Sequence, residues 1–201
     1  MWTAGELGIE YQREDVGGMF GGLDTESFAT LNPNRRIPVI DDGGTVVWES
    51  NAIVRYLCHQ YASDSLSPSD AASQASADQW MDWMSLSLEP DWIYVFHSLY
   101  RTPPEKRHTA AIDSAVKRIN MLYTLLDTHL AKHAFVAGDE FSMGDIPIGM
   151  TLYRYYELMD ITRPTLSALE RYYQRLCKRP AYRTHVMMDQ RTLHWTQNPV
   201  L

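Results

Sequence analysis

The sequence predicts an α+β chain in which a small part with strands and helices precedes an all-helical bundle. Three observations support this prediction. They are a hairpin pattern at residues 38–48, a Ser-, Ala- and Asp-rich segment at residues 62–76, and helical spacing of apolar residues after it. We therefore expect a first domain over residues 1–61, a linker over residues 62–76, and an all-α domain over residues 77–201.

The first part begins with a strand pattern and a short helix pattern. Residues 9–14 alternate between apolar and polar side chains, as a half-buried strand does. Residues 24–31 follow a glycine-rich loop and can form a helix with Asp24 or Thr25 as its N-cap. Pro33 then enforces a turn, because its ring fixes its own φ and restricts the preceding residue.

A hairpin and a helix complete the first part. The runs PVID (residues 38–41) and TVVW (residues 45–48) flank an Asp-Gly-Gly sequence, which is typical of a tight β-turn. A helix is expected from Glu49 to Tyr61, because its apolar residues recur on one face.

Nearly all of the remaining sequence has helical periodicity. Tryptophans and methionines concentrate in residues 80–96, and the pair Pro103-Pro104 separates this helix from the next one, Ala110–Leu130. Further helices are expected at residues 144–158, 166–178 and 182–188.

The composition excludes several classes of protein. A formal net charge of −7 disfavours binding to phosphate backbones, so we expect no nucleic-acid partner. No apolar run reaches the roughly 20 residues that cross a bilayer, and the start lacks the pattern of a signal peptide, so a cytoplasmic protein is expected without a membrane partner. Two cysteines, Cys58 and Cys177, lie in apolar helical patterns and are interpreted as small core residues.

Three local motifs carry the functional argument. The sequence NPNRRIPV (residues 32–39) combines a turn, two arginines and an Ile-Pro pair that alone would only begin an edge strand. The sequence WESNAIVRYL (residues 48–57) places Glu and Ser in the first turn of a helix, where both residues are common for capping reasons. Ser142 and Asp145 have the spacing of a capping box at the start of a buried helix, which is a folding device.

At these distances from one another, the three motifs resemble the glutathione S-transferase superfamily. The resemblance implies a thioredoxin-like first domain, a cis bond before Pro38, and glutathione as co-substrate. It also implies that the Ile37 backbone pairs with the cysteinyl part of glutathione and that Arg36 reaches its glycyl carboxylate. The γ-glutamyl carboxylate would then lie at Ser50 and the start of its helix, with Glu49 near the ammonium group.

The beginning of the sequence departs from the family pattern. Residues 2–8, WTAGELG, resemble the end of the family's first helix, so about 15 residues are expected upstream, including the first strand. The family's activating Ser, Tyr or Cys lies in that segment, so this sequence leaves the catalytic residue unidentified. The glycine-rich residues 15–25 further resemble a bacterial subgroup of the family, which usually carries a serine near the beginning of the chain.

Two functional hypotheses follow. In the first, glutathione thiolate attacks a small apolar electrophile that lies against Trp83 and Ser87, in a homodimer that serves detoxification. In the second, the fold is retained as a non-catalytic binding or interaction module. The electrophile and the choice among conjugation, peroxide reduction and thiol–disulfide exchange stay open. His129 and His133 have a spacing that a metal pair could use, but no third ligand is near in sequence, so no metal is expected.

Overall fold

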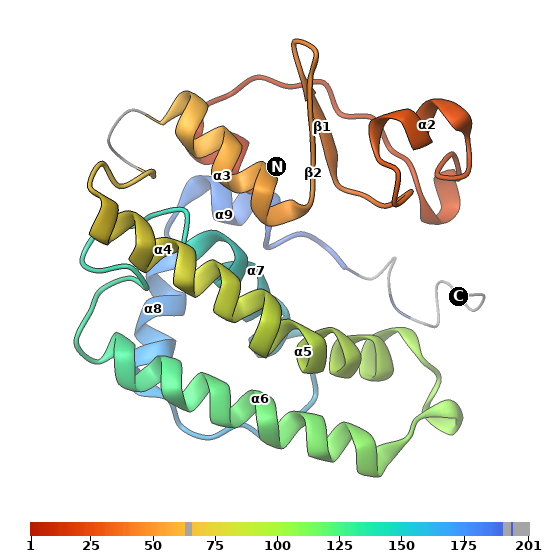
Figure 1. The fold of residues 1–201 in the computed structure, drawn as a ribbon. Coiled ribbons are helices and arrows are strands. Elements are labelled where there is room, and N and C mark those ends of the chain that lie inside the picture. Colours follow the sequence, from red (N-terminus) through yellow and green to blue (C-terminus); the bar gives the residue numbers. More distant parts are fainter. Residues whose placement is uncertain (63–65, 191–193, 195–201) are drawn as a thin grey trace.

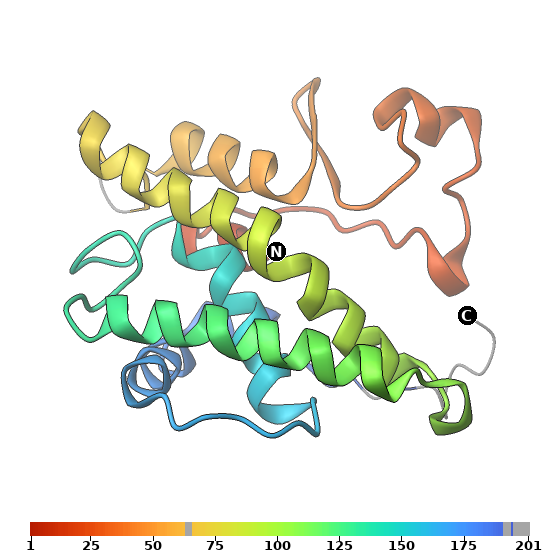
Figure 2. The same ribbon diagram turned by 60° about the horizontal axis from the view of Figure 1, so that its bottom comes forward.

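A computed structural model describes residues 1–62, 66–190 and 194 of the chain (Figure 1). Its elements confirm the predicted α+β order, with a hairpin and short helices first and helices only after residue 62 within the described residues. In both views the long helical run that begins with α4 lies between α3 on one side and α6 on the other (Figures 1 and 2).

The N-terminal part contains four helices of mixed type and one hairpin. Thr25 caps the second α-helix, where its hydroxyl accepts a hydrogen bond from the Phe28 N–H at 3.2 Å, as one of the two predicted caps requires. The elements are α1 (Trp2–Leu7), η1 (Gly18–Phe20), α2 (Glu26–Leu31), β1 (Val39–Asp42), β2 (Thr45–Trp48) and α3 (Ser50–Tyr61). The predicted hairpin and the helix after it are thus confirmed.

The two strands are antiparallel and joined by the tightest common type of turn. Their register pairs Val39 with Trp48 at the open end and Asp42 with Thr45 next to the turn. Gly43 and Gly44 both have positive φ values, of 59° and 95°, which a two-residue hairpin turn of this type requires. The Asp41 carboxylate accepts a hydrogen bond from the Gly44 N–H at 2.7 Å and closes the turn.

The expected strand at residues 9–14 is wrong. This segment belongs to no strand, and the described sheet consists of β1 and β2 alone. Alternating side chains satisfy only one requirement of a strand, since its backbone groups also need a neighbouring strand as partner. Within the described residues, no strand lies beside this segment to supply those hydrogen bonds.

The helical part begins inside the segment expected as linker. Asp70 caps α4 by accepting hydrogen bonds from the N–H groups of Ala72 and Ser73, so residues 71–76 are helical, while residues 63–65 lie outside the described residues. The helices are α4 (Ala71–Trp83), α5 (Glu89–Phe96), α6 (Thr109–Leu130), α7 (Asp145–Glu157), α8 (Ser167–Cys177) and α9 (Pro180–His185), with the short η4 (Pro104–Lys106).

One continuous helical run extends from α4 to Arg101 through two π-helical segments. These are η2 (Met84–Leu88), before α5, and η3 (His97–Arg101), after it. Pro90 gives a physical reason for η2, because its ring lacks an N–H and clashes with the carbonyl four residues earlier. A wider π turn at this point accommodates the proline without ending the helix.

The main core lies among the helices and contains several buried tyrosines whose hydroxyls are all bonded. Tyr123 bonds Thr151 at 2.7 Å, and Tyr172 donates to Asp145 at 2.8 Å. Asp145 also accepts from the Ser142 N–H at 2.8 Å, so the acidic half of the predicted capping box forms. The Ser142 hydroxyl instead accepts from Gly144 N–H at 3.3 Å, one residue earlier than a capping box requires. None of the described helices is long and apolar enough to cross a membrane.

Candidate functional site

A buried asparagine shapes the segment before β1. The Asn32 side chain donates to the Arg36 carbonyl at 2.7 Å and accepts from the Asn34 N–H at 3.0 Å. Arg35 occupies the left-handed region with φ of 53°, and its guanidinium donates to the Asp24 carbonyl. The turn is therefore stabilised by the Asn32 side chain within it and by the bond from Arg35 to the loop before α2.

The Ile37–Pro38 peptide bond is cis, as the resemblance implied. Ile37 is 55% exposed, and its backbone N–H and C=O form no hydrogen bond with any described residue. A backbone donor and acceptor are thus presented together at the edge of the hairpin. This arrangement can pair with an extended peptide-like ligand in the manner of an added strand.

The start of α3 is the second component of the site. Glu49 precedes the helix with a φ of 70°, a region that non-glycine residues rarely adopt and that clusters at ligand sites. No side chain caps this helix, so the N–H groups of its first turn are left for water or a ligand, and the exposed Ser50 hydroxyl lies among them. Such a helix start favours an anion.

The hairpin register brings these two components to one place. Because Val39 pairs with Trp48, the residues immediately outside this pair, Pro38 and Glu49, lie at the same open end of the hairpin. The predicted residues Arg36, Ile37, Pro38, Glu49 and Ser50 therefore occupy one end of the N-terminal part. The exposed Arg36 side chain forms no hydrogen bond or ion pair with a described residue.

The long helical run supplies two site neighbours that sequence reasoning missed. The Asn51 side chain donates to the Ser85 hydroxyl at 2.8 Å and to the Met81 carbonyl at 3.2 Å, which fixes the start of α3 against η2. Burial and the nearby Glu49 carboxylate raise the pKa of Glu89. Two carboxylates thus lie near the start of α3, a suitable environment for an ammonium group. Asn51 adjoins the predicted motif, whereas nothing local in the sequence indicates Glu89.

The two residues predicted for a second-substrate pocket lie elsewhere on the same helical run. Trp83 is half-buried and packs edge-on against Trp80, with ring centroids 5.1 Å apart, and Ser87 is exposed. The side chains that hold this run against α3 are Asp78, Asp82 and Ser85. The role of Trp83 and Ser87 stays a prediction.

Both cysteine thiols are free and poorly suited to activation. Burial raises the pKa of Cys58 to about 12 and also raises that of the half-buried Cys177. A nucleophilic or thiolate-stabilising cysteine needs the opposite shift. Neither thiol is therefore a candidate for the activating group.

The pair formed by His129, on α6, and His133, just after that helix, has a structural explanation. The His129 ring bonds the Val136 carbonyl at 2.8 Å and stacks on His133, with ring centroids 4.6 Å apart. Among residues 1–62, 66–190 and 194, no three potential ligands gather around a metal position.

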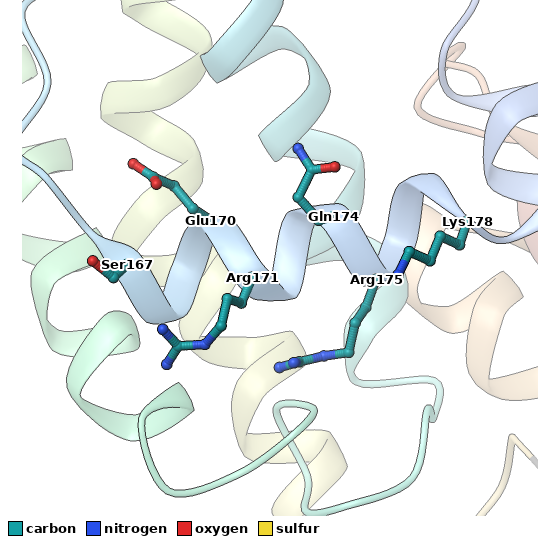
Figure 3. Close-up of a pocket in the computed structure, with 6 residues that line it drawn as sticks. All are labelled: Ser167, Glu170, Arg171, Gln174, Arg175 and Lys178. Carbon is teal, nitrogen blue, oxygen red and sulfur yellow. The ribbon is translucent and has the colours of Figure 1, made fainter.

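A cavity of about 500 Å³ lies along α8 and shares no residue with the site described above (Figure 3). Arg171 and Arg175 point to one side of the helix, while Glu170 and Gln174 point to the other. Arg175 already donates to the Ala134 carbonyl at 2.8 Å. The lining residues are Ser167, Glu170, Arg171, Gln174, Arg175 and Lys178, and they do not converge on one ligand.

Comparison with known proteins agrees with this reading of the fold. Residues 1–60 match the family model for the glutathione S-transferase N-terminal domain, and residues 88–180 match the model for the C-terminal domain. The chain is 39% identical over 188 residues to glutathione S-transferase GstB of Escherichia coli K12, covering 92% of this chain and 90% of GstB.

Solved structures give the same result. The theta class glutathione S-transferase of Xanthomonas axonopodis pv. citri, solved with glutathione bound, is 42% identical. It superposes with a TM-score of 0.89 over 94% of this chain and 90% of that one. Its apo form superposes with a TM-score of 0.81 at 37% identity, over 94% of this chain and 89% of that one.

These matches define the class as glutathione transferases, with a thioredoxin-like first part and a helical second part. The chain belongs to the glutathione S-transferase family.

Proposed function

We propose that this chain binds glutathione at the open end of the β1–β2 hairpin. The observation that carries the proposal is the register that sets the exposed Ile37 backbone beside the uncapped start of α3. The Ile37 N–H and C=O pair with the cysteinyl unit, and Arg36 binds the glycyl carboxylate. The Ser50 hydroxyl and the first-turn N–H groups bind the γ-glutamyl carboxylate, with Glu49 at its ammonium group.

The reaction we propose is transfer of the glutathione thiol sulfur to an apolar electrophile. The thiolate forms a carbon–sulfur bond while the leaving group departs with its electron pair, and the thiol proton passes to solvent. Trp83 and Ser87 are the residues we assign to the second substrate. In keeping with the family, we also propose a cytoplasmic homodimer with a detoxifying role. Each subunit would contain a glutathione-binding domain at residues 1–61 and an all-helical domain that begins at α4, six residues earlier than the expected start at residue 77.

One observation favours the alternative, a glutathione-transferase fold that binds without turnover. Catalysis at neutral pH needs a group that stabilises the thiolate, and both cysteines of this chain have raised pKa values. If binding occurs without conjugation, the module hypothesis is the better one.

Titration calorimetry with glutathione tests the site. Ser50→Ala removes a hydroxyl that we expect to bond a carboxylate, so the affinity should fall about 10- to 100-fold. Ser114→Ala is the matched control, since Ser114 lies on α6 and bonds only the Ala110 carbonyl. An unchanged affinity for Ser50→Ala in a protein that binds glutathione would contradict the assignment.

A conjugation assay with an aryl halide then separates the two functions. Turnover above the uncatalysed rate, lowered by Ser50→Ala at subsaturating glutathione, supports the enzyme. Glutathione binding with no turnover supports the module.

A further inference from the structure

Two arginines from different helices lie against one buried aromatic ring. The guanidinium carbon of Arg154, on α7, is 4.8 Å from the Phe96 ring centroid, and that of Arg101, in η3, is 5.8 Å from it. Phe96 itself is only 1% exposed and stacks between Trp92 and Tyr100. The separation of the two guanidinium carbons therefore cannot exceed the sum of these two distances.

Neither arginine has an acidic partner in the part of the chain that the structure describes. The Arg154 guanidinium forms no hydrogen bond or ion pair with a described residue, and the Arg101 Nε is buried without an acceptor. Every other half-buried arginine among the described residues donates to a carboxylate or a carbonyl. These are Arg35, Arg55, Arg107, Arg163, Arg175 and Arg179.

The charged groups that influence one another around Phe96 are all basic. Burial and the neighbouring Arg101 lower the pKa of Arg154, and burial with both arginines lowers the pKa of His97. Two like charges held together in a partly desolvated place repel each other. An anion between them would remove that repulsion and supply the acceptor that Arg101 lacks.

The arginine pair is connected to the proposed glutathione site by one helical run. Glu89, whose pKa the Glu49 carboxylate helps to raise, is followed at intervals of four residues by Ile93, His97 and Arg101. Such intervals keep side chains near one face, and twelve residues span about 18 Å. Ile93 is 40% exposed, so an apolar surface lies between the acidic end and the basic end of this face.

We propose that the second substrate carries an anionic group attached to an aromatic or apolar body, and that Arg101 and Arg154 receive this group. The inference rests on the proposed function for the reaction, but the anion site itself is defined by the two arginines and Phe96. A halogenated nitrobenzoate is a suitable probe. Glutathione sulfur bonds the ring carbon, the carbon–chlorine bond breaks, chloride leaves with its electron pair, and the thiol proton passes to solvent.

Binding is the first test, because it requires no turnover. Quenching of tryptophan fluorescence compares 4-chloro-3-nitrobenzoate with its uncharged counterpart, 4-chloro-3-nitrobenzamide. We expect the wild-type chain to prefer the benzoate by about tenfold or more. Arg101→Gln and Arg154→Gln should each reduce that preference toward one and leave the benzamide affinity unchanged, while Arg154→Lys should retain part of it.

Arg118→Gln is the matched control. It also removes one positive charge from the same region, but Arg118 is already paired with Asp91 through bonds of 2.7 and 2.6 Å. Equal binding of the two probes by the wild type, or an equal loss in Arg118→Gln and Arg101→Gln, would overturn the proposal. Circular dichroism identifies a variant that does not fold. If Arg154→Gln does not fold, the result for Arg101→Gln alone tests the proposal.

The same variants separate this inference from the proposed function. Calorimetry should show unchanged glutathione affinity in Arg101→Gln, because Arg101 is remote from Ser50. A benzoate preference without glutathione binding supports the anion site and contradicts the proposed function. Glutathione binding without a preference for the benzoate supports the proposed function and contradicts the anion site.

Discussion

The N-terminal part, residues 1–61, and the helical part that begins at α4 are stabilised in different ways. No residue of β1 or β2 is fully buried, and of the N-terminal part only Trp2, Val54 and Cys58 belong to the main core. The helical part contributes nearly all of that core. The hairpin that carries the proposed glutathione site therefore forms a thin layer, which depends on α1 and α3 for its attachment.

Both attachments are specific contacts. On α1, Trp2 packs edge-on against Tyr182 at 4.8 Å, and Glu6 accepts two bonds from Arg179 at 2.8 and 2.7 Å. On α3, Arg55 donates to Asp78 at 2.6 Å and to Asp82 at 2.7 Å. The comparison shows that the core of the helical part positions the N-terminal part. A change that destabilises these contacts should therefore also disturb the geometry of the proposed glutathione site.

Truncation of Trp2 should produce the largest effect. Trp2 is 5% exposed, and Trp2→Ala should reduce the free energy of unfolding by about 3–5 kcal/mol, because it leaves a cavity among helices of the other part. Urea unfolding measures this loss. Glutathione affinity should fall as well, if α1 positions the hairpin.

Trp48→Ala provides the contrast from within the N-terminal part. Trp48 is 37% exposed on β2, so the same truncation there should cost about 1 kcal/mol or less. Equal losses for the two variants would show that the N-terminal part has a substantial core of its own.

The fold was largely predictable where local patterns decide it. The helix expected at Ala110–Leu130 forms at Thr109–Leu130, because its apolar spacing matches the buried face throughout. The strand expected at residues 9–14 fails, because strand formation depends on a partner that the local sequence does not contain. Local sequence patterns therefore predict the helices of this chain, but they do not predict elements that need a partner from elsewhere in the fold.

The candidate site divides in the same way. The residues from Arg36 to Ser50 lie close in sequence and are joined by one hairpin, so motifs could indicate them. Glu89 reaches the same place from 40 residues away, and Arg101 meets Arg154 only through helix packing. No spacing rule connects such residues before the fold is known.

Two aspartates extend the comparison to electrostatics, and the one in the helical part gives the next prediction. Burial raises the pKa of Asp145 to about 6, against the bonds from Val136, Ser142 and Tyr172 that favour its carboxylate. Between pH 4 and pH 6 the folded chain then holds more protons at this group than the unfolded chain does. The contribution of Asp145 to the free energy of unfolding should therefore fall by roughly 2–3 kcal/mol as pH rises through this window, and it should not change further above pH 6.

Asp145→Asn does not titrate, so it isolates this contribution. Urea unfolding at pH 4.5, 5.5 and 7 should show the wild type's advantage over the variant shrinking as pH rises. An advantage that grows with pH would mean that the hydrogen bonds outweigh burial and that the pKa is lowered instead.

The aspartate of the N-terminal part gives the smallest effect and the opposite direction. Hydrogen bonds from the Tyr61 hydroxyl, at 2.6 and 2.7 Å, and from the Tyr56 hydroxyl, at 2.8 Å, lower the pKa of Asp42. The associated stability is present above the ordinary pKa of an aspartate and is lost as pH falls through the lowered value.

Tyr61→Phe should return the Asp42 pKa toward its ordinary value, with Tyr56→Phe having a lesser effect, as carboxyl carbon NMR titration would measure. The change in unfolding free energy at neutral pH should be slight, because this contact is exposed to solvent. If the Asp42 pKa did not move in either variant, the hydroxyls would not be its cause. In that case only burial would distinguish the two aspartates. Asp145 would be shifted because it is buried, and the Tyr61 and Tyr56 hydroxyls would have no effect on Asp42.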